Sequence, residues 1–231
     1  AHCSSEHPWF VESRSSTTNS KSDWFHWAEP KEDGSAPTNW LSFFGGQAWT
    51  WEPRRQQYYL HNFLPEQPNL NYANPAVLEE FNQIAKFWFD RGVDGFRLDA
   101  VHTINADSFP YKDNPANPKF KLGPLPQDQQ PFFRQLHDAA QLNQPAIQDF
   151  CASYRGIADS YENDRFLMGE VDGDNDSAII VSKTFTKPGR LHATYNFDLL
   201  EWGGLTVKEI KEAILRLSLI HISEPTRRIH I

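Results

Sequence analysis

The stretch that most constrains the fold runs from position 92 to 101 and reads Gly-Val-Asp-Gly-Phe-Arg-Leu-Asp-Ala-Val. Apolar residues occupy the even positions 96, 98 and 100, whereas Arg97 and Asp99 occupy the odd ones. This alternation predicts a strand that carries both charges on one face. The guanidinium beside Asp99 favours the ionised carboxylate. An isolated Arg-x-Asp is more often a structural ion pair than a functional site, so the neighbouring elements must decide between these two interpretations.

A helix is predicted immediately before this strand. Asn74 can cap its first turn, Pro75 suits the first helical position, and Gly92 supplies a stop. Its apolar face comprises Val77, Leu78, Phe81, Ile84, Ala85 and Trp88. Helix, tight turn and buried strand make half of a β/α repeat with a parallel sheet. Such sheets place their chemistry at the carboxyl ends of strands, so the context favours a site at Asp99.

The same order repeats further along the chain. Residues 145–161 predict a helix with its apolar face formed by Ile147, Phe150, Cys151, Tyr154, Ile157, Ala158 and Tyr161. Residues 165–171 predict a second short buried strand that ends in a lone carboxylate, Glu170. Neighbouring parallel strands lie about 4.8 Å apart, so we expect Asp99 and Glu170 to meet. At that spacing the pair suits a retaining glycosidase, in which one carboxylate attacks and the other transfers protons. The apolar neighbours Met168 and Gly169 would keep Glu170 protonated.

The other regions are less regular. Residues 1–65 predict short strands or packed segments, and so long an irregular stretch is expected to be a small inserted subdomain. Residues 102–131 read as a loop beside the site. Residues 132–141 predict a short helix, and residues 191–199 a third strand region. Thr206 and Glu209 form a capping box for a further helix.

Composition excludes several classes of partner. The net charge of −8 argues against nucleic acid, and no apolar run is long enough to span a membrane. The two cysteines, Cys3 and Cys151, provide neither a disulfide framework nor a metal-ligand cluster, and so few cysteines favour a cytoplasmic location. No metal site is expected at the acidic run 172–176, since Ser177 and Lys183 stand where a calcium loop needs Gly and Glu. The histidines at 102, 137 and 192 lack metal-ligand spacing and are expected to pack in loops or the core.

Four segments carry a family resemblance. They are Gly95–Val101 (GFRLDAV), Phe166–Val171 (FLMGEV), Gln67–Asn71 (QPNLN) and the N-terminal AHCSSEHPWF. They resemble conserved segments of glycoside hydrolase family 13, the α-amylase family, over most of residues 1–217. Asn69 replaces the usual Asp, and Ala1 and Cys3 replace the usual Asn and Thr.

The resemblance implies a fold and a set of roles. The fold is α/β, a partial (β/α)8 TIM barrel from the end of strand 3 to about the helix after strand 5, with a small irregular inserted domain B. Asp99 would be the nucleophile and Glu170 the general acid/base. Arg97 would contact the nucleophile, and His2 would contact a sugar hydroxyl in the subsite of the scissile glucose.

Within the family, residues 39–49 and 58–63 resemble the α-glucosidase and oligo-1,6-glucosidase branch. Ala100 is similar to the α-1,4-preferring enzymes. The expected activity is that of a retaining α-glucosidase, which hydrolyses terminal α-1,4-linked glucose from maltose and short malto-oligosaccharides through a covalent glycosyl-enzyme. A trehalose synthase or another transglycosylase or isomerase of the family stays open. A non-catalytic sugar-binding or transporter-associated relative is disfavoured, because such relatives tend to lose the acids that this chain keeps.

The resemblance also implies a layout. Residues 1–4 would end barrel strand 3, residues 5–66 form domain B, and residues 67–217 form a portion of the catalytic barrel. Residues 218–231 resemble a translated sequencing adapter and are expected to be non-native. No cofactor is expected in this chain; the calcium that many members bind would belong to an earlier loop. The family's third catalytic Asp has no counterpart, so we expect an internal fragment.

An incomplete barrel leaves sheet edges and apolar helix faces uncovered. We therefore expect the 231-residue chain, expressed alone, to be inactive and prone to aggregate. Size-exclusion chromatography with a glucose-release assay checks this, and a soluble monomer with glucosidase activity would contradict it.

Overall fold

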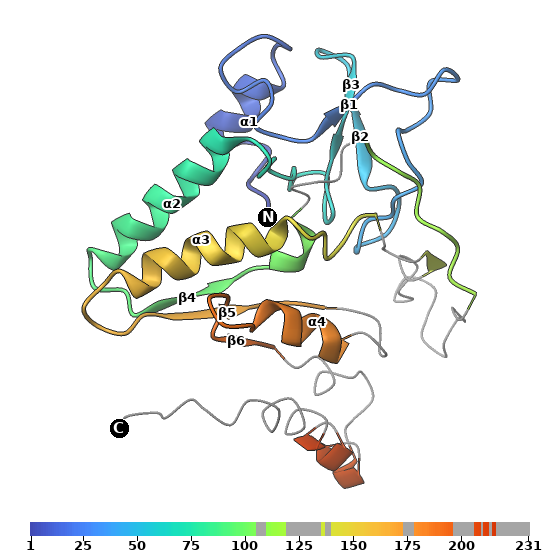
Figure 1. Cartoon of the computed structure of the whole chain (residues 1–231). Coiled ribbons are helices and arrows are strands. Elements are labelled where there is room, and N and C mark those ends of the chain that lie inside the picture. The colour runs from blue at the N-terminus through green and yellow to red at the C-terminus, as the bar shows by residue number, and fades with distance from the viewer. Residues whose placement is uncertain are drawn as a thin grey trace.

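The computed structural model describes residues 1–104, 110–118, 135–136, 140–172, 178–195, 206–208, 210–212 and 214–215. These ranges contain an antiparallel and a parallel sheet, each of three strands (Figure 1). The helices are α1 (Pro8–Ser13), α2 (Pro75–Phe89), α3 (Ile147–Asp159) and α4 (Ala178–Phe185), with a 3₁₀ turn η1 (Val101–Thr103). The strands are β1 (Trp27–Ala28), β2 (Trp49–Glu52), β3 (Gln57–Leu60), β4 (Gly95–Leu98), β5 (Phe166–Gly169) and β6 (Ala193–Thr194).

The parallel sheet has the strand order β4-β5-β6. Leu98 pairs with Gly169, and Gly169 pairs with Thr194, so the three strands end at the same level. Figure 1 shows α2 and α3 side by side along this sheet, with α4 next to β6. The predicted order of helix, turn and parallel strand is therefore confirmed for both repeats.

Helix α2 begins and ends as its sequence indicates. The Asn74 side chain accepts a hydrogen bond from the Ala76 amide (2.9 Å), and Gly92 ends the unit in a left-handed conformation (φ +88). The buried face differs from the predicted one at its end, because Trp88 is 46% exposed and Phe89 is buried instead. Phe89 packs on Phe96 of β4, with ring centroids 4.8 Å apart, and that contact orients the last turn.

Helix α3 follows its predicted pattern closely. Its buried residues are Ile147, Phe150, Cys151, Tyr154 and Ala158. The Tyr154 hydroxyl donates to the carbonyl of Phe81 (2.9 Å) and so joins α3 to α2. Burial raises the pKa of the Cys151 thiol to about 12, so this cysteine packs as a small apolar residue.

The N-terminal third contains the antiparallel sheet, in the order β1-β3-β2. A small core around Trp40, Trp49 and Leu60 supports it. Other aromatic residues from the same region, such as Phe10 and Phe25, belong to the main core that α2 and α3 share. The N-terminal third therefore shares a core with α2 and α3 rather than standing apart from them.

Two helices were not predicted. Helix α1 has six residues, too few for a periodic pattern, although the His7 ring accepts from the Trp9 amide (3.2 Å) and Pro8 opens it as a cap sequence would. Helix α4 was also missed. The predicted helix over 132–141, the capping residue Glu209 and the tail 218–231 lie largely or wholly outside the described residues.

Close pairing of β4 with β5 requires a glycine at position 95. A Cβ there would collide with the backbone carbonyl of Phe166, whereas a Cβ on Gly156 of α3 would meet nothing within 4 Å. We expect Gly95→Ala to lower the stability by about 2–3 kcal/mol through overpacking. The matched control Gly156→Ala should raise it by about 0.5–1 kcal/mol through helix propensity. Thermal unfolding midpoints, compared side by side, check the pair; equal midpoints would contradict the strand geometry.

Candidate active site

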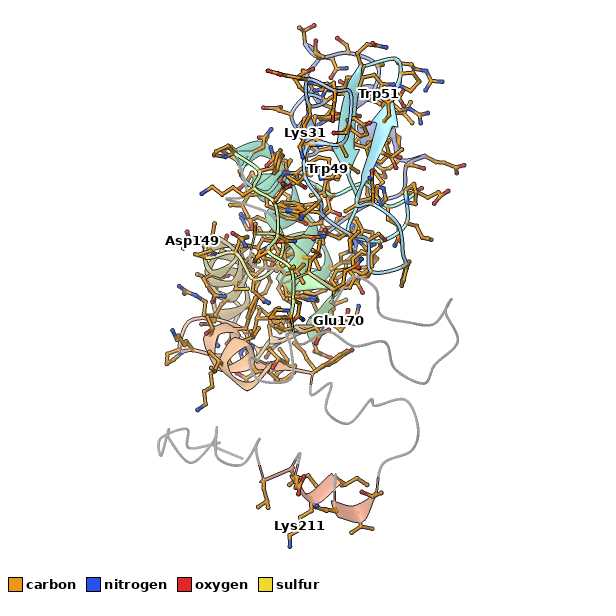
Figure 2. All side chains as sticks on the ribbon, turned by 90° about the vertical axis from the view of Figure 1, so that its right-hand side faces the viewer. Lys31, Trp49, Trp51, Asp149, Glu170 and Lys211 are labelled. Carbon is orange, nitrogen blue, oxygen red and sulfur yellow. The ribbon has the colours of Figure 1, made fainter. Side chains whose placement is uncertain are left out.

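Three side chains follow the three parallel strands at equivalent positions. Asp99 comes directly after β4, Glu170 after β5 and Tyr195 after β6. Because Leu98, Gly169 and Thr194 are in register, these three residues emerge at the same edge of the sheet. Figure 2 shows Glu170 in the parallel half of the molecule and the labelled Trp49 and Trp51 on the antiparallel sheet.

The guanidinium of Arg97 contacts all three. Its Nη1 forms an ion pair with Asp99, and its Nη2 lies 2.5 Å from Oε2 of Glu170. Its Nε donates to the hydroxyl of Tyr195 (3.1 Å). The structure thus brings together the predicted residues Asp99, Glu170 and Arg97 and adds Tyr195. Tyr195 lies inside the strand region predicted over residues 191–199, but the sequence does not indicate that the strand itself covers only Ala193–Thr194 and ends just before this residue.

The charge on Arg97 decides the state of Asp99. Partial burial alone would raise the pKa of Asp99, but the hydrogen bond and the positive charge of Arg97 outweigh burial and lower this pKa below its usual value of 3.8. The Asp99 side chain stays 55% exposed, so a reactant can reach it. An ionised, accessible carboxylate is what a nucleophile or an electrostatic stabiliser requires.

Glu170 lies in a polar setting rather than the apolar one expected from its neighbours in sequence. Its carboxylate accepts from Arg97 and from the backbone N–H of Ala100 (3.0 Å). Ala100, predicted to influence linkage, is itself buried and adopts a left-handed conformation (φ 42, ψ 42). His102, expected only to pack, places Nδ1 3.2 Å from the Glu170 carbonyl oxygen.

His2 interacts electrostatically with Asp99. Its Nε2 is 2.8 Å from the Gln67 side-chain nitrogen, and its ring meets Phe63 edge-on at 5.2 Å. Burial lowers the pKa of His2 to about 4, and the nearby charge of Asp99 only partly opposes this. At neutral pH the ring is therefore uncharged and can both donate and accept a hydrogen bond.

The segment that contains Asn69 joins the two halves of the molecule. Asn69 pairs with His2 in an isolated antiparallel bridge. Its buried side chain accepts from the Asn62 amide (3.0 Å) and donates to the Thr103 carbonyl (3.4 Å). A carboxylate cannot make the second bond, so the amide at this position has a physical reason.

The described residues contain no group of three or more His, Cys, Asp or Glu side chains arranged to hold a metal ion. Most of the acidic run 172–176 falls outside them. Within the same ranges, no helix has the length and apolar character needed to cross a bilayer.

A parallel sheet with two carboxylates and an arginine at its carboxyl edge is the arrangement expected of a β/α catalytic domain. The family profile described as alpha amylase, catalytic domain, matches residues 1–228, and the chain belongs to the α-amylase family.

Comparison with individual proteins is more specific. The chain is 41% identical over 216 residues to a probable alpha-glucosidase of Rhizobium meliloti (strain 1021), which covers 93% of this chain and 38% of that protein. It is 35% identical over 204 residues to an oligo-1,6-glucosidase of Heyndrickxia coagulans, covering 87% of this chain and 33% of the relative. The crystal structure of the alpha-glucosyl transfer enzyme XgtA superposes with a TM-score of 0.85 and 40% identity, covering 95% of this chain and 40% of XgtA. The chain thus spans about two-fifths or less of each relative.

The pKa of Asp99 provides a test that does not depend on activity. Removing the Arg97 charge in Arg97→Gln should raise the pKa of Asp99, because the hydrogen bond and the charge of that arginine are what lower it. Arg97→Lys, which keeps a positive charge, should retain most of the depression. A ¹³C NMR titration of the Asp99 carboxyl measures both variants, and an unchanged pKa in Arg97→Gln would contradict the assignment.

Proposed function

We propose that this chain carries the nucleophile and the general acid/base of a retaining α-glucosidase. The observation that supports this most strongly is the contact of one guanidinium with Asp99 and Glu170, which follow paired strands in register. Two carboxylates that share one guanidinium are close enough for the spacing of about 5–5.5 Å that retaining glycosidases use. Inverting enzymes separate their carboxyl groups further, to leave room for a water molecule.

In the proposed reaction, the Asp99 carboxylate attacks the anomeric carbon of a terminal glucose while the glycosidic C–O bond breaks. Glu170 gives its proton to the departing oxygen. Glu170, now ionised, then takes a proton from water, whose oxygen attacks the anomeric carbon and releases Asp99. Arg97 keeps Asp99 ionised at the start. The neutral His2 would bind a hydroxyl of the same glucose.

The proposed substrates are small α-glucosides, chiefly maltose and short malto-oligosaccharides with α-1,4 links. The names of the two curated relatives support the glucosidase activity, and they differ in the linkage they imply. Ala100 supports the α-1,4 preference, since a small residue after the nucleophile leaves room on the aglycone side. Both cysteines are free thiols, which suits the cytoplasm, the proposed location.

The proposed architecture is a portion of a (β/α)8 barrel. Residues 1–4 would end strand 3, residues 5–66 form domain B, and residues 67–217 supply strands 4 and 5 with their helices, before a non-native tail from 218. The sheet order β4-β5-β6 and the shared core support this layout. The remaining catalytic groups would lie in parts of the longer protein that correspond to the unmatched regions of the relatives.

A second candidate, glucosyl transfer, is favoured by one observation. The XgtA structure is an alpha-glucosyl transfer enzyme, and its similarity to this chain is as high as that of the curated glucosidase. Transfer shares Asp99 and Glu170 with hydrolysis and differs in whether water or a sugar resolves the covalent intermediate.

Product analysis on maltose separates these activities in the longer protein that contains this chain. We expect glucose as the main product, with α-configured glucose released first. Longer oligosaccharides as the main product would indicate transfer instead, and trehalose would overturn the proposal in favour of an isomerase.

The proposed nucleophile is tested by Asp99→Asn in the same protein. The amide cannot attack the anomeric carbon, so hydrolysis of maltose should fall by at least about 10³-fold. Asp94→Asn is the matched control, because the Asp94 side chain is 96% exposed and forms an ion pair with Arg165 at 3.6 Å. Retained hydrolysis of maltose in Asp99→Asn would contradict the proposed mechanism.

A further inference from the structure

The turn after β4 wraps around Glu170. The Glu170 amide donates to the Leu98 carbonyl (2.9 Å), and its own carbonyl accepts from the Val101 amide (3.1 Å). Burial lowers the pKa of His102, so its ring is neutral and its Nδ1–H can donate to the same carbonyl (3.2 Å). With the Ala100 amide on the carboxylate, the end of β4 and the turn after it together contact Glu170 at its amide, its carbonyl and its side chain.

The contact with the carboxylate depends on an unusual backbone conformation. Ala100 has φ 42 and ψ 42, the left-handed region that non-glycine residues enter only at a cost of about 1 kcal/mol. Ala100 is 3% exposed and carries a side chain, so neither contact with water nor the conformational freedom of glycine explains its left-handed backbone. The surrounding contacts must therefore hold it in place.

Thr103 supplies those contacts from inside the same turn. Its amide and its hydroxyl both donate to the Ala100 carbonyl, at 2.9 Å and 2.8 Å, and the residue is fully buried. The amide bond belongs to any 3₁₀ turn, but the hydroxyl bond is specific to the side chain. The carbonyl of Thr103 in turn accepts from Asn62 (3.1 Å) and Asn69 (3.4 Å), which belong to the inserted region and its return segment.

We propose that Thr103 is a positioning residue for the acid/base Glu170, because its hydroxyl locks Ala100 in the left-handed turn that aims the Ala100 N–H at the carboxylate. This role rests on the proposed function of Glu170 as the general acid/base. Thr103 itself touches no reacting atom. Through Asn62, the inserted region also helps to fix the geometry of Glu170.

The consequence is a specific kinetic signature. Without the hydroxyl, the turn can relax toward ordinary backbone angles and withdraw the Ala100 N–H from the carboxylate. Glu170 then loses a hydrogen bond that holds its carboxylate in place, so proton transfer to the leaving group should slow. The loss should therefore be larger for a substrate whose leaving group needs a proton than for one whose leaving group departs without help.

The experiment compares Thr103→Val with Thr103→Ser in the longer protein that contains this chain. Valine keeps the shape and removes the hydroxyl, whereas serine keeps the hydroxyl. Each variant is assayed on maltose, whose leaving group needs a proton, and on 4-nitrophenyl α-glucoside, whose leaving group departs with little help. Thr103→Ala is added in case valine packs poorly. Thr184→Val is the matched control, because that hydroxyl also bonds a backbone carbonyl (2.9 Å) but lies on α4.

We expect Thr103→Val and Thr103→Ala to lose about tenfold or more in kcat on maltose and less than about threefold on the nitrophenyl substrate. Thr103→Ser should stay near the parent on both substrates. Equal losses on the two substrates in Thr103→Val would overturn the proposal. Insoluble valine and alanine variants beside a soluble serine variant would also overturn it, since the hydroxyl would then serve folding. A parent protein inactive on both substrates would refute the proposed function instead.

Discussion

One guanidinium, that of Arg97, connects the ends of three parallel strands. It reaches Asp99, Glu170 and Tyr195 only because β4, β5 and β6 end at the same level. That register depends on close packing, since Gly95 lies against the backbone of Phe166 and leaves no room for a side chain. The chemistry at the sheet edge therefore depends on backbone packing at Gly95, four residues before Asp99.

A second constraint comes from buried polar groups. Hydrogen bonds between side-chain amides connect the N-terminal third to the segments that follow β4. The Gln141 amide nitrogen donates to Asn62 (2.8 Å), and the Asn114 amide nitrogen donates to Gln141 (3.2 Å). Buried amides are costly unless they are paired, so such a network favours one arrangement of the two regions over others. It ends at Thr103, through Asn62, and thus at the turn that contacts Glu170. The N-terminal third is thus joined to the site by the hydrogen bond from Asn62 to Thr103 as well as by a shared aromatic core.

Much of the fold and of the candidate site could be predicted from the sequence, because these features depend on local sequence patterns. The cap at Asn74, the periodicity of α3 and the alternation around Arg97 each depend on residues within one element. Other features could not be predicted, for identifiable reasons. The choice of Phe89 over Trp88 depends on a ring from the next strand, and Tyr195 depends on the register of a two-residue strand. The left-handed backbone at position 100 could not be predicted because the residue is neither glycine nor asparagine. It depends on the contacts of Ala100 with Thr103 and Glu170 together.

The shared contact of Arg97 also bears on how two carboxylates could exchange roles. In the structure, Asp99 and Glu170 compete for the same positive charge. On the proposed mechanism, Asp99 loses its charge when it forms the glycosyl-enzyme, and the guanidinium then has Glu170 as its remaining carboxylate partner. Glu170 then has the larger share of the Arg97 charge at the stage when it must accept a proton from water. When Asp99 is released, its carboxylate again shares Arg97 with Glu170. A single arginine between the two acids can thus couple the contacts of one to the covalent state of the other.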